Sequence, residues 1–288
     1  IADLAMAEQN DKVATAYTGA EQKFGQEYLI PKPFDPRLIA RIAPAVAKAA
    51  MDSGVATRPI ADLEAYAEKL TEFVYKTSLF MRPVFNQARK DIKRIVLTEG
   101  EDERVLHAAQ QVVSQKLAFP ILVGDAKLIE ERLHSQGLTI QPGKDFELVD
   151  IKNSPYYEAS WKEYYNLRKR KGVTEEMARR RLKANTTLVG ALLVRLGHAD
   201  GLVCGTMGRF HDHFAVMEEV IGYNNPEKEA FAMNALISNK GNFFIADTYI
   251  NENPTAEQLA NGTLMCAAEM KRFGIKPKVA LVSNSNYG

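Results

Sequence analysis

The chain has 288 residues, of which 46% are hydrophobic and 25% are charged, an ordinary composition for a folded protein that excludes a disordered or fibrous one. Lys and Arg total 37 against 36 Asp and Glu, so the net charge of +1 lacks the basic excess of proteins that bind nucleic acid or membrane surfaces. The two cysteines form no disulfide framework and no apolar run is long enough to span a bilayer. We therefore expect a cytoplasmic protein with no nucleic-acid or membrane partner.

The first ninety residues predict a mainly helical segment. Three prolines exclude a helix over 28–36, whereas apolar residues at helical spacing predict one over 37–52, with Gly54 as its C-cap. A second helix is predicted over 63–77. Residues 80–93 contain a proline and four basic side chains, and they are interpreted as a connector into a second domain.

From Lys93 on, strands alternate with helices at the spacing of βαβ units. This pattern predicts an α/β fold, a three-layer sandwich with a mainly parallel sheet. The segment ADGLVCG is apolar enough to be buried on both faces, so we expect it at the centre of the sheet. Strands are predicted at 94–100, 118–125, 145–151, 199–205 and 243–250, and helices at 101–116, 126–137, 156–171, 174–184, 186–196, 212–221 and 255–273.

Both ends of the sequence look cut. The chain starts without Met, and it stops after KPKVALVSNSNYG, which predicts a buried strand over 279–283 and then a turn. In an open α/β sheet a helix is expected to follow such a turn. We therefore expect a fragment, and a true C-terminus on an edge strand is the alternative.

The stretch DGLVCGTMGR, from Asp200 to Arg209, is the most informative candidate site. A predicted strand leads here through a glycine-rich loop into a helix, an arrangement that leaves backbone N–H groups bare for phosphate or another anion. Arg209 adds the capacity for a charge-assisted contact. The glycines match neither a Walker loop nor a GxGxxG fingerprint, so a plain tight turn is an equally good interpretation.

Other chemically interesting groups have simpler interpretations. His211 and His213 point in different directions on a helix and lack the partners of a zinc site, so no metal is predicted. Cys204 is interpreted as a small buried hydrophobe. The acidic run at 99–103 is interpreted as complementing the dipole of the next helix, with a catalytic carboxylate as the alternative.

Five motifs, taken in order, resemble those of bacterial hybrid NADP-dependent malic enzymes. Residues 24–58 resemble the end of a Rossmann-type NAD(P)-binding domain, and residues 93–288 resemble the N-terminal part of a phosphate acetyltransferase domain. The motifs are IVLTEGEDERVLHAA, AFPILVGD, ADGLVCG, FIADTYINENPTAEQLA and KVALVSNSNYG. The resemblance implies four parts: the end of the NAD(P)-binding domain at 1–58, a helical linker at 59–92, a first acetyltransferase-like lobe at 93–241, and the start of an incomplete second lobe at 242–288.

The resemblance also implies a parent enzyme that oxidises malate with NADP and decarboxylates it to pyruvate and CO2, assisted by Mg²⁺ or Mn²⁺. In that family the acid–base pair, the metal ligands and the dinucleotide loop all precede the position of Phe24. No catalytic residue can therefore be assigned here, and we expect the fragment to need no cofactor and to lack malic activity.

The acetyltransferase-like part departs from the pattern of true phosphate acetyltransferases. In those enzymes an Asp follows the strand that ADGLVCG matches, and an Arg three residues later holds the phosphoryl substrate. Asp212 keeps the first position, but Ala215 stands at the second. The family's coenzyme A motifs lie beyond Gly288. Arg209 remains a possible source of charge, so an active phosphate acetyltransferase is the alternative function.

In the hybrid enzymes the second domain is understood as a sensor that binds acetyl-CoA and lowers malic activity. The resemblance implies a homo-oligomer, with helices 186–196 and 255–273 as candidate interfaces, and a scaffold that binds no ligand is a third hypothesis. Segments 37–52, 62–77 and 80–92 are the expected conduit between the domains. The implied acetyl-CoA wall comprises Thr98, Glu99, Gly100, Gly205, Thr206, Arg209 and Asp212, with Ser283 and Asn284 on the second lobe.

Overall fold

The structure, a computed structural model, describes Leu4 and residues 29–30, 37–74, 76–151, 153–238 and 241–282. The chain divides into two units, one made of residues 1–83 with 237–241 and the other of residues 84–236 with 242–288. Most of the proline-rich segment 28–36 and the candidate residues Ser283 and Asn284 lie outside the described ranges.

The described residues from Arg37 to Pro83 are mainly helical, as predicted. Helix α3 (Arg37–Asp52) covers the predicted range and packs against α4 (Leu63–Val74), and Gly54 behind it has the left-handed φ of +73° that suits a C-cap. The predicted helix over 63–77 is instead two helices, because α5 (Lys76–Lys90) begins within it. Helix α5 also runs through Pro83 across the predicted connector, although a proline lacks an N–H donor and crowds the carbonyl of the preceding turn.

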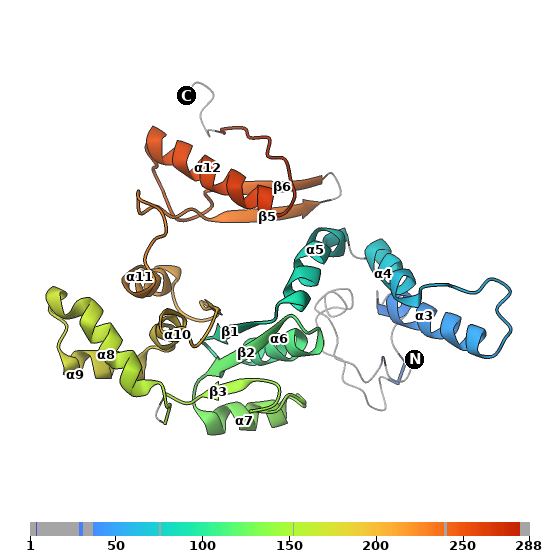
Figure 1. Cartoon of the computed structure of the whole chain (residues 1–288), viewed down its shortest axis with the longest axis horizontal. Helices are drawn as coiled ribbons and strands as arrows, with labels where there is room; N and C mark the ends of the chain where they lie inside the picture. The colour runs from blue at the N-terminus through green and yellow to red at the C-terminus, as the bar shows by residue number, and fades with distance from the viewer. Residues whose placement is uncertain are drawn as a thin grey trace. The chain divides into compact units, whose positions relative to one another are not determined.

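A four-stranded parallel sheet forms the centre of the second unit, in the order β3-β2-β1-β4 (Figure 1). The α/β class with a parallel sheet is therefore confirmed. The register pairs Leu97 of β1 with Leu122 of β2 and with Val203 of β4. The strands are β1 (Lys93–Leu97), β2 (Ala118–Val123), β3 (Glu147–Val149) and β4 (Gly201–Val203).

Strand β4 corrects one prediction. Its apolar sequence predicted a central strand buried on both faces, but within the described residues it pairs only with β1, at the end of the sheet, and Val203 is 58% exposed. An apolar composition indicates that a strand packs against other parts of the protein. It does not specify the position of the strand in the sheet.

Helices cover both faces of the sheet, which makes the three layers that the sequence predicted (Figure 1). Successive side chains of a strand point to opposite faces. Leu122 accordingly packs with α6 and α7, whereas Ile121 and Val123 pack with the helices of the other face. The helices are α6 (Glu103–Ser114) and α7 (Ala126–Ser135) on one face, and α8 (Tyr157–Arg168), α9 (Glu175–Ala184), α10 (Thr186–Arg195) and α11 (Phe210–Val220) on the other.

Helix starts follow from side-chain caps. Thr174 caps α9, as its predicted start requires, by accepting a hydrogen bond from the Met177 amide. Asp102 caps α6 in the same way, so part of the acidic run has a structural role. Between α8 and α9 the chain makes a short 3-10 helix, η1 (Lys169–Lys171), and then turns at Gly172, whose φ is +86°.

Helix α10 is buried between the sheet and its neighbouring helices. Leu188 and Leu192 are both fully buried, so this helix is not available as an interface between subunits, and the prediction that residues 186–196 supply one is wrong. An apolar sequence on all sides of a helix is typical of a core helix. Trp161 of α8, the single tryptophan, is 3% exposed in the same cluster.

The last described elements are a two-stranded sheet and one helix. Strand β5 (Met233–Ser238) was not predicted, β6 (Gly241–Ala246) starts two residues before the predicted strand, and α12 (Ala256–Arg272) starts after a capping box at Thr255. Residues 279–282 form no strand, and Val282 is 90% exposed, so the predicted buried strand is wrong over these residues. A strand needs a neighbour for its backbone hydrogen bonds, and no described strand pairs with them. None of the described helices has the length and apolar character required to cross a membrane.

Gly190 marks the closest approach of α10 to the sheet. A Cβ atom added there would lie 2.6 Å from the Thr98 Cγ2 atom and 3.2 Å from the Val96 Cγ1 atom. We expect Gly190→Ala to lower the free energy of unfolding by about 1–3 kcal/mol through overpacking, despite the better helix propensity of alanine. Urea unfolding followed by Trp161 fluorescence measures this change.

The matched control is Gln111→Ala on the exposed side of α6, which is expected to change the free energy of unfolding by less than about 0.5 kcal/mol. A Gly190→Ala protein as stable as the unaltered chain would contradict the close packing.

Candidate functional site

The candidate site lies where the adjacent parallel strands β1 and β4 end. The amide of Thr98, which is fully buried, donates to the Val203 carbonyl over 3.2 Å, and the amide of Gly205 donates to Glu99 Oε1 over 3.1 Å. These bonds hold the two chain segments together beyond the ends of the strands. The structure thus brings Thr98, Glu99 and Gly205 together at the edge where open α/β sheets bind ligands.

The contact between Glu99 and Gly205 changes one expectation for the glycine-rich loop. The Gly205 N–H was expected to be bare and available to an anion, but the Glu99 carboxylate, 11% exposed, already accepts its hydrogen bond. A ligand that reaches this point meets a negative charge rather than a free donor.

His213 of α11 holds the other end of the loop. Its Nε2 atom lies 2.7 Å from the Met207 carbonyl oxygen, and its Nδ1 atom lies 2.8 Å from Thr187 Oγ1. Because a carbonyl oxygen only accepts, Nε2 carries the hydrogen, and in the neutral imidazole Nδ1 accepts from the threonine hydroxyl. Nδ1 also lies 3.9 Å from Glu99 Oε1, so one side chain links α10, α11 and the loop.

Gly208 makes this contact possible. Its φ is +93°, in the left-handed region, and a Cβ atom there would lie 3.0 Å from His213 Nε2. Sequence reasoning missed this link, because it considered the two histidines on α11 only as metal ligands. Histidine-to-carbonyl contacts depend on the path of the loop, which residue spacing does not reveal.

Arg104 fixes the middle of the loop. Its guanidinium donates to the Thr206 carbonyl oxygen over 3.2 Å and to Asp102 Oδ2 over 2.8 Å. The hydrogen bond from Arg104 lowers the pKa of the Asp102 carboxyl below its ordinary value. Thr206, a predicted ligand residue, is therefore held through its backbone.

Gly100 and Glu101 have structural roles at the same edge. The Gly100 amide donates to the Val123 carbonyl over 3.0 Å, and a Cβ atom at this position would lie 2.9 Å from that oxygen. Glu101 Oε1 accepts from the Asp125 amide over 2.7 Å. Together with the cap at Asp102, these bonds favour the structural interpretation of the acidic run over a catalytic carboxylate.

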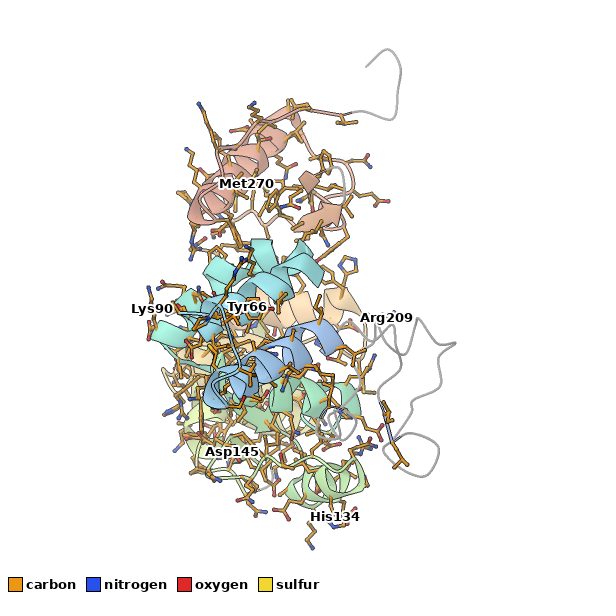
Figure 2. The ribbon with its side chains drawn as sticks, turned by 90° about the vertical axis from the view of Figure 1, so that its right-hand side faces the viewer. Tyr66, Lys90, His134, Asp145, Arg209 and Met270 are labelled. Carbon is orange, nitrogen blue, oxygen red and sulfur yellow. The ribbon has the colours of Figure 1, made fainter. Side chains whose placement is uncertain are left out.

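Arg209 and Asp212 lie at the start of α11. This helix begins at Phe210, two residues before its predicted start at residue 212. Arg209 is the N-cap residue, and its exposed side chain, labelled in Figure 2, makes no capping bond. Asp212 is exposed in the first turn, and its amide donates to the Arg209 carbonyl over 3.1 Å. Ala215 is exposed on the same helix and brings no charge to this surface.

An aromatic contact joins α11 to the loop after β6. The ring of Phe210 meets that of Tyr249 edge to face, with centroids 4.9 Å apart. Asp247 organises this loop, because its carboxylate accepts from the Ala232 amide over 3.0 Å and from the Asn251 amide over 2.7 Å. Burial raises the pKa of Asp247, but these backbone N–H groups outweigh it and hold the pKa below its usual value.

The lowered pKa of Asp247 predicts a loss of stability in acid. Its contribution is complete above the unfolded value of 3.8 and disappears as the pH falls through the lower folded value. We expect Asp247→Asn to be less stable than the unaltered chain at about pH 7, with the difference shrinking by about pH 3. Urea midpoints from circular dichroism at each pH measure it.

The control for this pH dependence is Glu252→Gln, an exposed acid in the same region, which is expected to leave the profile unchanged. A constant stability difference between Asp247→Asn and the unaltered chain at every pH would contradict the assignment.

Cys204 and the side chains that could bind a metal are the remaining reactive groups to consider at the site. Burial, followed by the charge of Glu99, raises the pKa of the Cys204 thiol, which disfavours the thiolate that a nucleophile requires. Cys204 lies just after β4 and is half-buried, so it is not inside the strand as predicted. Among the described residues, no three His, Cys, Asp or Glu side chains cluster in a way that could hold a metal ion.

The chain is similar in sequence and in structure to proteins that are already known. Residues 79–288 match the family described as phosphate acetyl/butaryl transferase. Over all 288 residues the chain is 57% identical to an NADP-dependent malic enzyme of Salmonella typhimurium and 57% identical to one of Escherichia coli, and it spans 38% of the length of each. A phosphotransacetylase from Streptococcus pyogenes has a similar solved structure, with a TM-score of 0.62 and 27% identity, covering 72% of this chain and 64% of that one.

Proposed function

The chain belongs to the phosphate acetyl/butaryl transferase family, and we propose that it is the regulatory part of an NADP-dependent malic enzyme, where it binds acetyl-CoA as an inhibitor. The full-length similarity to two malic enzymes supports the parent activity, the oxidative decarboxylation of malate to pyruvate and CO2. We propose four parts: the end of the NAD(P)-binding domain at 1–58, a helical linker at 59–92, a first acetyltransferase-like lobe at 93–241 and the start of a second lobe at 242–288. We place the parent enzyme in the cytoplasm.

NADP and the divalent metal belong, in this proposal, to the part of the parent outside this chain. The described residues contain no group that fits a metal ion, and the sequence contains no GxGxxG loop for a dinucleotide. This chain alone is therefore proposed to lack malic activity and to need no cofactor.

One observation supports the proposal most strongly. The sheet edge where ligands bind in this fold is present, but the arginine expected to hold a phosphoryl substrate is not. The ends of β1 and β4 keep the family's fold, but Ala215 stands at the arginine position and the Gly205 amide is taken by Glu99. Truncating one partner of a hydrogen-bonded charge pair typically costs about 2–5 kcal/mol. These features favour ligand binding over transfer of an acetyl group to phosphate.

The proposed acetyl-CoA site comprises the residues predicted from the sequence, and each group of residues has a different role in it. Arg209 is the exposed cation that faces a phosphate of the ligand, and Asp212 shares the first turn of its helix. Thr98, Glu99, Gly100, Gly205 and Thr206 shape the edge through the backbone bonds described above. Ser283 and Asn284 stay assigned to the second lobe.

Oligomerisation is the second part of the proposal. The candidate surface is α12, where Leu264 is 70% exposed, now that α10 is known to be buried. A symmetric dimer through this helix would bury its apolar side chains. If the protein forms a stable oligomer and acetyl-CoA does not bind, the scaffold hypothesis replaces the sensor.

The segments 37–52, 62–77 and 80–92 are proposed to couple the two domains, because they connect them in sequence. Inhibition requires acetyl-CoA to bind one arrangement of the parent enzyme more tightly than another. The strength of the coupling therefore equals the difference in the affinity of acetyl-CoA for the two arrangements, whichever of these helices transmits it.

Two assays test the function in the parent enzyme. Malate-dependent reduction of NADP is expected to fall as acetyl-CoA is added, and coenzyme A alone is the control. Formation of acetyl phosphate from acetyl-CoA and phosphate is expected to be undetectable. Steady formation of acetyl phosphate would favour the alternative function, an active phosphate acetyltransferase, and malic activity indifferent to acetyl-CoA would overturn the sensor.

A further inference from the structure

A second cavity lies away from the candidate site, between α8 and α9, which pack side by side in Figure 1. Its volume is about 380 Å³, within the range of small-molecule pockets. Gly172, just before α9, lets the chain turn sharply so that the two helices pack against each other. The cavity is lined by Tyr164, Val173, Met177, Arg180, Arg181 and Ala184.

Behind the lining residues Tyr164 and Arg181 lies a charged cluster with more positive than negative charge. Glu219 of α11 accepts from Arg168 over 3.2 Å and pairs with Arg181 over 2.9 Å, so one carboxylate serves two guanidinium groups. The Tyr164 hydroxyl bonds both to Glu219 and to Arg181. Burial raises the pKa of Tyr164, so the phenol stays neutral and adds no compensating charge.

Arg180 adds a second, uncommitted cation at the rim. It is exposed, it lines the cavity, and no described residue forms an ion pair or hydrogen bond with it. Glu176, one turn earlier on α9, is the nearest acid in sequence on the same side, and the two are not paired. By contrast, Arg179 next to it is engaged, because it stacks over the Trp161 ring at 3.6 Å.

The surrounding segment concentrates positive charge in an otherwise balanced protein. Between residues 168 and 183 basic residues outnumber acidic ones eight to two, although the whole chain has a net charge of only +1. Such a local excess raises the concentration of small anions near the cavity. The basic residues are Arg168, Lys169, Arg170, Lys171, Arg179, Arg180, Arg181 and Lys183.

The remaining walls are apolar. Val173, Met177 and Ala184 line the cavity, and Met177 is 44% exposed, so its methyl group is open to a ligand. A hydrocarbon group placed there would be removed from water, whereas inorganic phosphate would leave this surface uncovered. The cavity thus combines guanidinium groups at one place with aliphatic surface at another.

We propose that the cavity between α8 and α9 binds a small organic carboxylate, whose carboxylate pairs with Arg180 and whose hydrocarbon body packs on Val173 and Met177. The planar guanidinium matches a carboxylate with two parallel hydrogen bonds. Arg181, held by Glu219 and Tyr164, contributes charge without moving. This site is separate from the proposed acetyl-CoA edge and does not depend on it.

The test uses hexanoate as the probe and the Met177 methyl group as the reporter. The chain is labelled with carbon-13 at its methionine methyl groups, and Met177→Leu identifies the signal. Hexanoate is expected to shift that signal saturably. Hexanol, which lacks the charge, and inorganic phosphate, which lacks the hydrocarbon body, are each expected to bind about tenfold more weakly or not at all.

Two substitutions of equal charge change locate the binding group. Arg180→Gln is expected to weaken hexanoate binding about tenfold, because it removes the charge-assisted pair. Arg170→Gln, on exposed η1 and outside the lining, is expected to change it by less than about twofold. Unchanged Trp161 fluorescence confirms that both variants fold.

Three results would overturn the proposal. The first is a Met177 signal that does not move with hexanoate while the protein is folded. The second is equal weakening by both substitutions, which would indicate only diffuse attraction by the basic segment. The third is equal binding of hexanol and hexanoate, which would mean that the cavity recognises the hydrocarbon alone.

Discussion

Replacing Glu219 with alanine is expected to lower the free energy of unfolding by about 3 kcal/mol, the scale of breaking a buried ion pair. The Glu219 and Arg168 side chains are only 19% and 20% exposed, and Arg181 shares the same carboxylate. Alanine would leave two guanidinium groups close together without a counter-charge. It would also leave the Tyr164 hydroxyl without its carboxylate partner.

Urea unfolding followed by Trp161 fluorescence measures this loss, because the single tryptophan lies in the same core. Glu218→Ala is the matched control, since it removes an exposed acid from the neighbouring position of α11, and it is expected to cost less than about 1 kcal/mol. Adding Arg168→Met to Glu219→Ala is expected to restore part of the stability. Equal losses for the two glutamates would contradict the role assigned to this pair.

Replacing Arg209 with alanine is expected to weaken acetyl-CoA binding about tenfold in a chain that continues past Gly288. Arg209 is exposed at the N-terminus of α11, where the helix dipole and the guanidinium both favour a phosphate group. The substitution removes no contact of the core, so folding is expected to be unchanged. Isothermal titration of acetyl-CoA into both proteins measures the effect.

The control for Arg209 is Arg170→Ala, which removes an exposed arginine of η1, far along the chain from the proposed ligand edge. It is expected to change the affinity by less than about twofold. If Arg209→Ala binds acetyl-CoA as tightly as the unaltered protein, the phosphate contact assigned to Arg209 is wrong.

Local signals in the sequence were enough to predict most elements of the sandwich. Thr174 and the two acids after it define the start of α9, and the continuous apolar run AFPILV defines β2. Such features depend on residues close in sequence, as caps and periodicity do. The linker was predicted to be helical, but the boundary between α4 and α5 was not predicted, because one helix was expected over 63–77.

The elements that were misjudged depend on distant neighbours. Strand β4 was expected at the centre because it is apolar, but its exposure is decided by which segments lie beside it. The segment 279–282 has the composition of a strand and no described partner. Strand β5, which was missed, pairs with β6, and its sequence alone carries only weak alternation.

The candidate edge was located from the sequence, but not its internal bonds. The order of strand, glycine-rich loop and helix placed Gly205 and Arg209 after the strand that is β4 in the structure. The contacts of His213 with Met207 and of Arg104 with Thr206 join residues through the path of the loop. No pattern in a single sequence specifies such contacts, because backbone carbonyls are the same at every residue.

The measurement that tests the central proposal most directly is isothermal titration of acetyl-CoA, with coenzyme A and acetyl phosphate as controls. It is made on this chain and on a chain that continues through the rest of the second lobe. We predict saturable binding of acetyl-CoA to the longer chain and none to this one, because the coenzyme A motifs that the resemblance implies lie beyond Gly288 and would complete the opposite wall. Absence of binding to both folded proteins would contradict the sensor and leave the domain as an assembly scaffold.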